Sequence, residues 1–343
     1  MSVELPSLVD VRRAQGRLAR LLTPTPLVRS EWLSALTGAE IFLKLESLQP
    51  TRSFKIRGAF NALLSLRDRL GSERPTVVTA SAGNHGRALA HAAAELGFPA
   101  IVFTPSTAPE TKKSAIRRSG AELRDESADY DEAEQKSRAY ANSSGGTYVS
   151  SYNDREVIAG AGTAALEIVE QCPSFDVLVV PLGGGGLLSG LATAIRGLNL
   201  QTQVVGVECE ASTAFAASLA RGTITEITPV ATIADGLTGN LEKGSLTFEL
   251  VRQHVDRVVT VSEADLLSAI RLLAEHDHLI AEGAGAAASA AVMTRAVVSP
   301  GQRAVVMLSG GNIDLATFTS AVSKAESPRG LANFVRGATA NRQ

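Results

Sequence analysis

Short apolar runs, each followed by a turn and then by an amphipathic helix, recur along this chain of 343 residues. In the clearest case the run 177–180, Val-Leu-Val-Val, is followed by a polyglycine turn and a helical pattern that reaches Arg196. The runs 76–79 and 100–103 begin units of the same kind. Strands that alternate with helices pair in parallel through crossover connections. The sequence therefore predicts an α/β fold built on parallel sheets.

The alternation forms two blocks, which predicts two open parallel-sheet α/β domains. We expect a large domain of residues 1–50 and 151–325 and a small domain of residues 51–150. A loose basic tail is expected over residues 326–343. In open sheets of this kind, ligands bind outside the carboxyl ends of the strands. We therefore expect the functional site in the cleft between the two domains.

We also predict a helix at the start of the chain and one long irregular connection. A first helix is expected to begin after Ser7 and to run to about Leu22, where a Thr-Pro-Thr-Pro sequence follows. Residues 221–245 are rich in Gly, Thr and Pro, so we expect an irregular connection there.

The polyglycine turn predicts an anion site. Four glycines, Gly183 to Gly186, precede Leu187 between a predicted strand and a predicted helix. Their backbone N–H groups can turn towards one phosphate, and the helix dipole adds about half a positive charge. The spacing fits neither a dinucleotide fingerprint nor a P-loop. A merely flexible turn is the alternative interpretation.

Lys55 stands at the start of a predicted helix, where the dipole disfavours a cation. An exposed loop lysine would explain this without any function. A lysine whose pKa is lowered can instead form a Schiff base with an aldehyde. Together with a phosphate-binding turn, this lysine indicates pyridoxal phosphate (PLP).

Two further polar turns follow predicted strands. Ser81-Ala82-Gly83-Asn84-His85-Gly86 can receive a carboxylate at a helix N-terminus, and Asn84 can donate to a phenolate oxygen. His85 is either a general base or, more simply, a support for the loop. The Ser309 hydroxyl can bond a pyridine nitrogen without keeping it protonated, which favours elimination over transamination. Ser309 is also a candidate helix N-cap.

The composition limits the partners and the cellular location that we expect for this protein. The 33 basic and 35 acidic residues leave a net charge of −2, so no nucleic-acid partner is expected. Two cysteines, Cys172 and Cys209, fit a reducing cytoplasm. Neither a signal peptide nor a bilayer-length apolar run is present in the sequence, so we expect no membrane association.

These motifs together resemble the fold-type II PLP-dependent enzymes, which are tryptophan synthase β-like. The similarity covers residues 10–320 and is strongest to the serine/threonine dehydratase (ammonia-lyase) branch, which is related to serine racemase. The segments that carry it are Ser-Phe-Lys-Ile-Arg-Gly-Ala at 53–59, Ser-Ala-Gly-Asn-His-Gly at 81–86, the polyglycine turn, Val-Ile-Ala-Gly-Ala-Gly-Thr at 157–163 and Ser-Gly-Gly-Asn at 309–312. The resemblance also implies a homodimer.

The resemblance implies a role for each matching position. Lys55 would be the catalytic Schiff-base lysine. The other cofactor-binding residues would be Phe54 beside the ring, Asn84 at the ring oxygen, Ser309 at the ring nitrogen, Gly236 and Glu282 near the ring, and Gly183, Gly184, Gly185, Gly186 and Leu187 around the phosphate. The substrate carboxylate would be bound by Ser81, Ala82, Gly83, Asn84 and His85.

The sequence also departs from the family's pattern. Ala82 replaces the serine that racemases use as a second base, which argues against racemisation. Glu208 matches one ligand of the family's divalent-cation site, but Ala214 stands where an acid is expected, and Glu210 is a weak substitute, so we predict no metal. Arg52 replaces a usual glycine, and Arg87 replaces a usual glutamine.

We therefore predict β-elimination of a β-hydroxy-α-amino acid, such as threonine or serine, to a 2-oxo acid and ammonia. The two arginines suggest, as an alternative, a bulkier or acidic substrate such as phenylserine or 3-hydroxyaspartate. A racemase, a β-replacement synthase and a non-enzymatic binding protein remain rival hypotheses.

Overall fold

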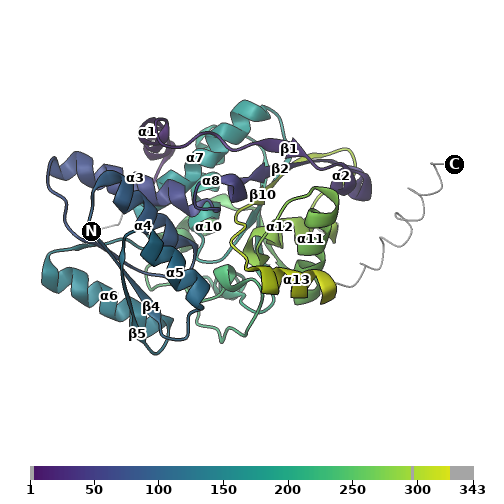
Figure 1. Cartoon of the computed structure of the whole chain (residues 1–343). Helices are drawn as coiled ribbons and strands as arrows, with labels where there is room; N and C mark the ends of the chain where they lie inside the picture. Colours follow the sequence, from purple (N-terminus) through teal and green to yellow (C-terminus); the bar gives the residue numbers. More distant parts are fainter. Residues whose placement is uncertain (1–3, 295–296, 325–343) are drawn as a thin grey trace.

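The computed structural model describes residues 4–294 and 297–324. It contains two β-sheets, of six and four strands, and both are flanked by helices (Figure 1). Every strand pair is parallel except the one at the edge of the larger sheet. The predicted α/β class with parallel sheets is confirmed. The predicted basic tail lies outside the described residues.

The larger sheet has the strand order β1-β2-β10-β7-β8-β9. Its strands are β1 (Leu27–Arg29), β2 (Glu40–Leu45), β10 (Arg303–Leu308), β7 (Val177–Pro181), β8 (Gln203–Cys209) and β9 (Arg257–Val261). Strand β1 runs antiparallel to β2, because only the short helix α2 (Glu31–Thr37) separates the two strands in the sequence. This edge is the one departure from the predicted parallel pairing.

Helices cover both faces of the larger sheet, which explains its uninterrupted apolar runs. Val177 and Val179 pack in one cluster with α2, α11 and α12, whereas Leu178 and Val180 pack in another with α7, α8 and α10. The helices associated with this sheet are α1 (Leu8–Leu18), α2, α7 (Arg155–Gln171), α8 (Gly186–Gly197), α9 (Ala214–Arg221), α10 (Leu246–His254), α11 (Glu263–His276), α12 (Gly283–Met293) and α13 (Leu315–Lys324), with the 3-10 turns η1 (Glu46–Leu48) and η2 (Asp235–Leu237).

The smaller sheet has the order β5-β4-β3-β6 and is entirely parallel. Its strands are β3 (Val77–Ala80), β4 (Ala100–Pro105), β5 (Glu122–Ser127) and β6 (Thr147–Tyr148). The helices of this part are α3 (Lys55–Leu70), α4 (Asn84–Leu96), α5 (Glu110–Arg118) and α6 (Tyr130–Ser144). Helix α3 packs against α4 and also against α7, so it joins the two parts of the molecule (Figure 1).

One helix boundary was predicted wrongly, and two helices were missed. Helix α1 ends at Leu18, four residues earlier than expected, and a turn completes the segment. Helices α9 and α10, on either side of the irregular connection, were not predicted. The connection over residues 221–245 is irregular, as expected, apart from the short turn η2.

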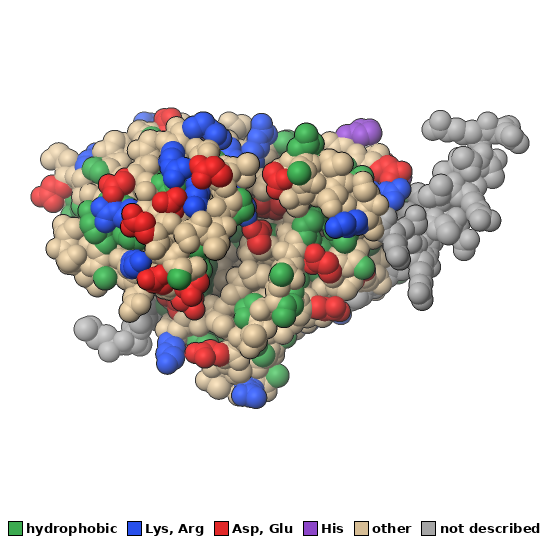
Figure 2. Space-filling model, turned by 60° about the horizontal axis from the view of Figure 1, so that its bottom comes forward, with side chains coloured by type: hydrophobic (Ala, Val, Ile, Leu, Met, Phe, Trp, Pro, Cys, Tyr) green, Lys and Arg blue, Asp and Glu red, His purple; other side chains and the backbone are tan. Residues whose placement is uncertain are grey.

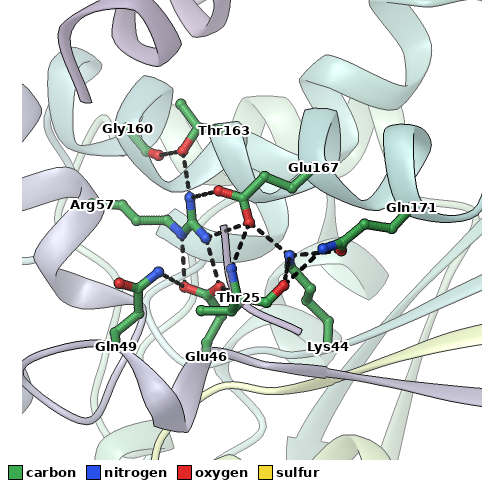
Figure 3. A network of polar contacts seen from close by, with 9 residues as sticks. All are labelled: Thr25, Lys44, Glu46, Gln49, Arg57, Gly160, Thr163, Glu167 and Gln171. Carbon is green, nitrogen blue, oxygen red and sulfur yellow. Dashed lines mark hydrogen bonds and ion pairs between the residues drawn. The ribbon is translucent and has the colours of Figure 1, made fainter. Parts of the chain in front are cut away.

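A buried ionic network fixes the start of α3 (Figure 3). Arg57, two residues after Lys55, donates from Nε and Nη2 to the two carboxylate oxygens of Glu46, each over 2.7 Å. It also donates to both oxygens of Glu167 on α7, over 2.6 and 2.8 Å. Lys44 of β2 donates to the same Glu167 over 2.6 Å. Two cations and two carboxylates therefore neutralise one another where β2, η1, α3 and α7 meet.

Candidate active site

The carboxyl ends of strands from both sheets meet at the start of α3. Ser53 forms an isolated antiparallel bridge with Gly310, just after β10, and the Phe54 N–H donates to the Ser309 carbonyl over 3.0 Å. These bonds bring Lys55 and Ser309, which are 254 positions apart in the chain, to one place. Figure 2 shows that the molecule is hollowed between its two lobes.

Lys55 has the environment of a reactive amine. Its Nζ donates to the Ser151 carbonyl over 2.7 Å and lies 5.2 Å from the centroid of the Phe54 ring. Removal from water lowers the pKa of Lys55 to about 8, although the negative charge of Glu282 acts in the opposite direction. A free lysine has a pKa of about 10.4, so far more of Lys55 is the nucleophilic free amine near neutral pH.

This pKa makes a direct prediction for the cofactor-free protein. A short pulse of acetic anhydride at a series of pH values is expected to label Lys55 half-maximally near pH 8. Mass spectrometry of the peptide that contains Lys55 measures the labelling, and the exposed Lys243 serves as the reference amine. Labelling of Lys55 that follows the same pH curve as Lys243 would contradict the burial argument.

A chain of amide hydrogen bonds crosses the site. Asn84, the first residue of α4, donates from Nδ2 to Glu282 Oε1 over 2.6 Å. Asn312 Nδ2 donates to Asn84 Oδ1 over the same distance and to the Thr51 carbonyl over 2.8 Å. Burial raises the pKa of Glu282 to about 7, and the bond from Asn84 opposes that rise. Glu282 can therefore gain or lose a proton close to neutral pH.

The polyglycine turn lies between β7 and α8, as predicted. Gly185 has a φ of 87°, and a Cβ at Gly184 would lie 2.5 Å from the Tyr152 ring, so both positions require glycine. A Cβ at Gly183 would lie 2.9 Å from the Gly236 carbonyl oxygen, which brings η2 to the turn. Within residues 4–294 and 297–324, the N–H groups of Gly183, Gly184 and Gly185 have no acceptor. The turn therefore offers a row of free donors.

The Ser81 turn joins β3 to α4 and holds itself in shape. The Gly83 N–H donates to Ser81 Oγ over 3.2 Å, and a Cβ at Gly86 would lie 2.2 Å from the Ser81 carbonyl oxygen. His85 is 2% exposed, and its Nε2 lies 3.3 Å from the Val149 carbonyl. Burial, and then the charge of Lys55, lower the pKa of His85 to about 3, so the imidazole is neutral. This geometry favours the supporting role over the general base.

The arrangement fits pyridoxal phosphate. Buried polar atoms are left without partners around Lys55, namely Ser53 Oγ, Thr51 Oγ1 and His85 Nδ1. The Ser309 hydroxyl likewise makes no hydrogen bond to any part of the chain that the structure describes. A site with a free amine, unused N–H donors and a free hydroxyl matches the cofactor's aldehyde, phosphate and ring nitrogen.

The structure also adds residues that sequence reasoning missed. Ser151 and Tyr152 contact Lys55 and the polyglycine turn, respectively, and Asn312 links Asn84 to Thr51. Ser151 and Tyr152 follow β6, and their position after a parallel strand is the signal that could have identified them. Asn312 stands at the end of the Ser-Gly-Gly-Asn motif.

Glu208 makes a different contact from the one that the family's cation site would need. Its two carboxylate oxygens accept the N–H groups of Phe215 and Ala216 over 2.8 and 2.9 Å, so it caps α9. Burial raises the pKa of Glu208 to about 7, against these two bonds. No group of three or more His, Cys, Asp or Glu side chains gathers for a metal in the part of the chain described.

Fold and site together define an enzyme of the PLP-dependent class. The chain belongs to the pyridoxal-phosphate dependent enzyme family, whose profile matches residues 18–310. It is 41% identical over 318 residues to an L-threonine ammonia-lyase of Thermotoga maritima, covering 93% of this chain and 78% of that protein. It is 39% identical to an L-threo-3-hydroxyaspartate ammonia-lyase of Pseudomonas sp, covering 93% and 99%. A maize serine racemase structure superposes with a TM-score of 0.85 at 32% identity, covering 94% and 99%. The predicted family and cofactor are confirmed.

Proposed function

We propose that this enzyme catalyses β-elimination on a β-hydroxy-α-amino acid and releases a 2-oxo acid and ammonium. The substrate loses water, and hydrolysis of the unsaturated product returns that water, so the overall change is loss of ammonium. The observation that carries the proposal is the amine of Lys55, with a pKa of about 8, beside the row of free N–H donors. Similarity to two ammonia-lyases over more than nine-tenths of the chain supports it.

One group of residues would hold the cofactor and accept the α-proton. Bound PLP supplies an electron-accepting ring that stabilises the charge left when the α-proton is removed. Lys55 would hold the cofactor through its amine, and its Nζ accepts the α-proton as a general base. The N–H groups of Gly183 to Leu187 would hold the phosphate, with Gly236 beside them, and Ser309 would face the ring nitrogen. A serine there leaves the ring a weak electron sink, which favours prompt loss of the β-hydroxyl.

The remaining residues orient the reactants. The turn from Ser81 to His85, including Ala82 and Gly83, would bind the substrate carboxylate through backbone donors. Asn84 would donate to the ring oxygen, and Phe54 and Glu282 would border the ring. The hydrogen bond between Asn84 and Glu282 keeps both side chains in place before substrate arrives. Fixed orientation of the Cα–H bond lowers the entropic part of the barrier.

The assembly and location are also proposals. The division into domains 1–50 with 151–325, and 51–150, is supported by the two separate sheets. A homodimer is proposed from the family resemblance, and sedimentation equilibrium would test it. Cytoplasmic location is supported by two free, buried cysteines. No helix among the described residues is long and apolar enough to cross a membrane.

A substrate panel tests the reaction. PLP-loaded protein is mixed with L-threonine, L-serine, L-threo-phenylserine or L-threo-3-hydroxyaspartate, and 2-oxo acid and ammonium are measured. We expect the cofactor's absorbance band and equal amounts of both products from at least one substrate. The absence of 2-oxo acid with every substrate would overturn the proposal. Inversion of recovered substrate would then indicate racemisation, and incorporation of an added thiol would indicate β-replacement.

A further inference from the structure

Three arginines from separate segments gather beside the candidate active site. Arg52 lies in the turn before α3 with a φ of 62°, Arg87 lies in the first part of α4, and Arg118 ends α5. Arg87 is half-buried, whereas Arg52 and Arg118 are exposed. Burial lowers the pKa of Arg87, and the like charges of Arg118 and Arg52 lower it further. Arg87 is therefore reached by the positive charges of both Arg118 and Arg52.

No carboxylate of the described chain forms an ion pair with any of these three arginines. Arg117, the neighbour of Arg118, pairs with both Glu110 and Asp125. The negative charge of Glu282 reaches Arg87, but the bonded partner of Glu282 is Asn84. The like charges of Arg52 and Arg118 are unfavourable for Arg87, which has no ion-pair partner among the described residues, and a bound anion would relieve this repulsion.

Hydrogen bonds connect this arginine cluster directly to the site. Arg87 Nη1 donates to Asn312 Oδ1 over 2.6 Å, and Asn312 donates in turn to Asn84 and to the Thr51 carbonyl. Arg87 is thus two hydrogen bonds away from Asn84. Thr51 is 2% exposed, and its buried Oγ1 has no partner. Asn312 therefore links the Arg87 guanidinium to the backbone of Thr51, whose hydroxyl is left without a partner.

We propose that Arg87, with Arg52 and Arg118 at the rim, binds a side-chain carboxylate of the substrate. The inference rests on the proposed function and narrows it to β-hydroxy amino acids with an acidic side chain, of which 3-hydroxyaspartate is the simplest. A guanidinium binds a carboxylate through two parallel hydrogen bonds, which neither a methyl nor a phenyl group can accept. Loss of ammonium from this substrate leaves a 2-oxo dicarboxylate, so atoms and charge balance.

Kinetics of Arg87→Gln test the proposal. Glutamine keeps a donor for Asn312 but removes the charge. For L-threo-3-hydroxyaspartate we expect kcat/KM to fall by about 10-fold to 100-fold, mainly through KM, which is the usual effect of losing a charge-assisted hydrogen bond. For L-threonine we expect little change. Arg87→Lys should restore part of the loss, and Arg117→Gln is the matched control on α5.

Binding of unreactive acids separates this inference from the proposed reaction. Succinate and butyrate have the same number of carbons, but only succinate carries two carboxylates. Calorimetric titration of the holoenzyme is expected to show tighter binding of succinate, and Arg87→Gln is expected to abolish that preference. Equal losses of kcat/KM for both amino acids, or equal binding of both acids by the unmodified enzyme, would overturn the inference. If no substrate yields a 2-oxo acid but the succinate preference depends on Arg87, the proposed reaction fails and the dicarboxylate site stands.

Discussion

Replacing Lys55 by alanine is expected to lower kcat for 2-oxo acid release by at least about 10³-fold, within the range that general acid–base catalysis supplies. The substitution removes the amine that accepts the α-proton, and His85 cannot take over this role, because its pKa of about 3 makes the imidazole a very weak base. The free energy of unfolding should not fall, because the substitution removes an amine whose charged form burial already disfavours. An assay of 2-oxo acid at saturating substrate, with thermal unfolding followed by circular dichroism, measures both effects.

Two additions make the Lys55 experiment specific. Ethylamine added to Lys55→Ala is expected to restore part of the activity, because a free amine can then enter the space left by the side chain. Lys243→Ala removes an exposed lysine and should behave as the unmodified enzyme. A Lys55→Ala protein that keeps more than about a tenth of the activity would contradict the general-base role, since a base supplies at least about 10²-fold.

The strands could be predicted because buried strands give a simple pattern of apolar residues in the sequence. A parallel strand covered by helices on both faces is apolar at every position, as in the run 177–180 of β7. Helix α9 escaped prediction because its N-terminus is capped from a distance: Glu208, at the end of β8, accepts the N–H groups of Phe215 and Ala216. Thr213, directly before α9, makes no side-chain capping bond, and Glu208 was considered as a metal ligand instead.

The same distinction between local and distant signals applies to the residues of the candidate active site. Residues whose role depends on their own turn, such as the glycines between β7 and α8, could be found from local spacing. Asn312 acts through bonds to Asn84 and Thr51, which are 228 and 261 positions away in the chain. Only the fold brings those partners together, so the role of Asn312 could not be predicted from the sequence alone.

The ionic network around Arg57 was likewise invisible in the sequence, although it joins the start of α3 to β2, η1 and α7. Arg57 and Lys44 are 1% and 0% exposed, and Glu46 is fully buried. Burial alone would raise the pKa of Glu46, but Arg57 and the hydrogen bonds outweigh it and lower the pKa. Glu46 therefore stabilises the fold above its unfolded pKa of about 4.3, and this contribution is lost as the pH falls towards the lowered value.

Replacing Arg57 by methionine is expected to reduce the free energy of unfolding by about 3–5 kcal/mol, the usual cost of leaving a buried charge without its partner. Lys44 then faces two carboxylates, Glu46 and Glu167, alone. Because this excess negative charge raises a carboxylate pKa above its unfolded value, the folded variant takes up a proton that the unfolded chain lacks. The deficit relative to the unmodified protein should therefore shrink as the pH is lowered from 7 to about 5. Urea unfolding at several pH values measures this difference in the free energy of unfolding.

Glu46→Gln added to Arg57→Met restores charge balance and should recover a large part of the lost free energy of unfolding. A double variant as unstable as the single one would show that the packing of Arg57, rather than its charge, holds α3 against β2 and α7.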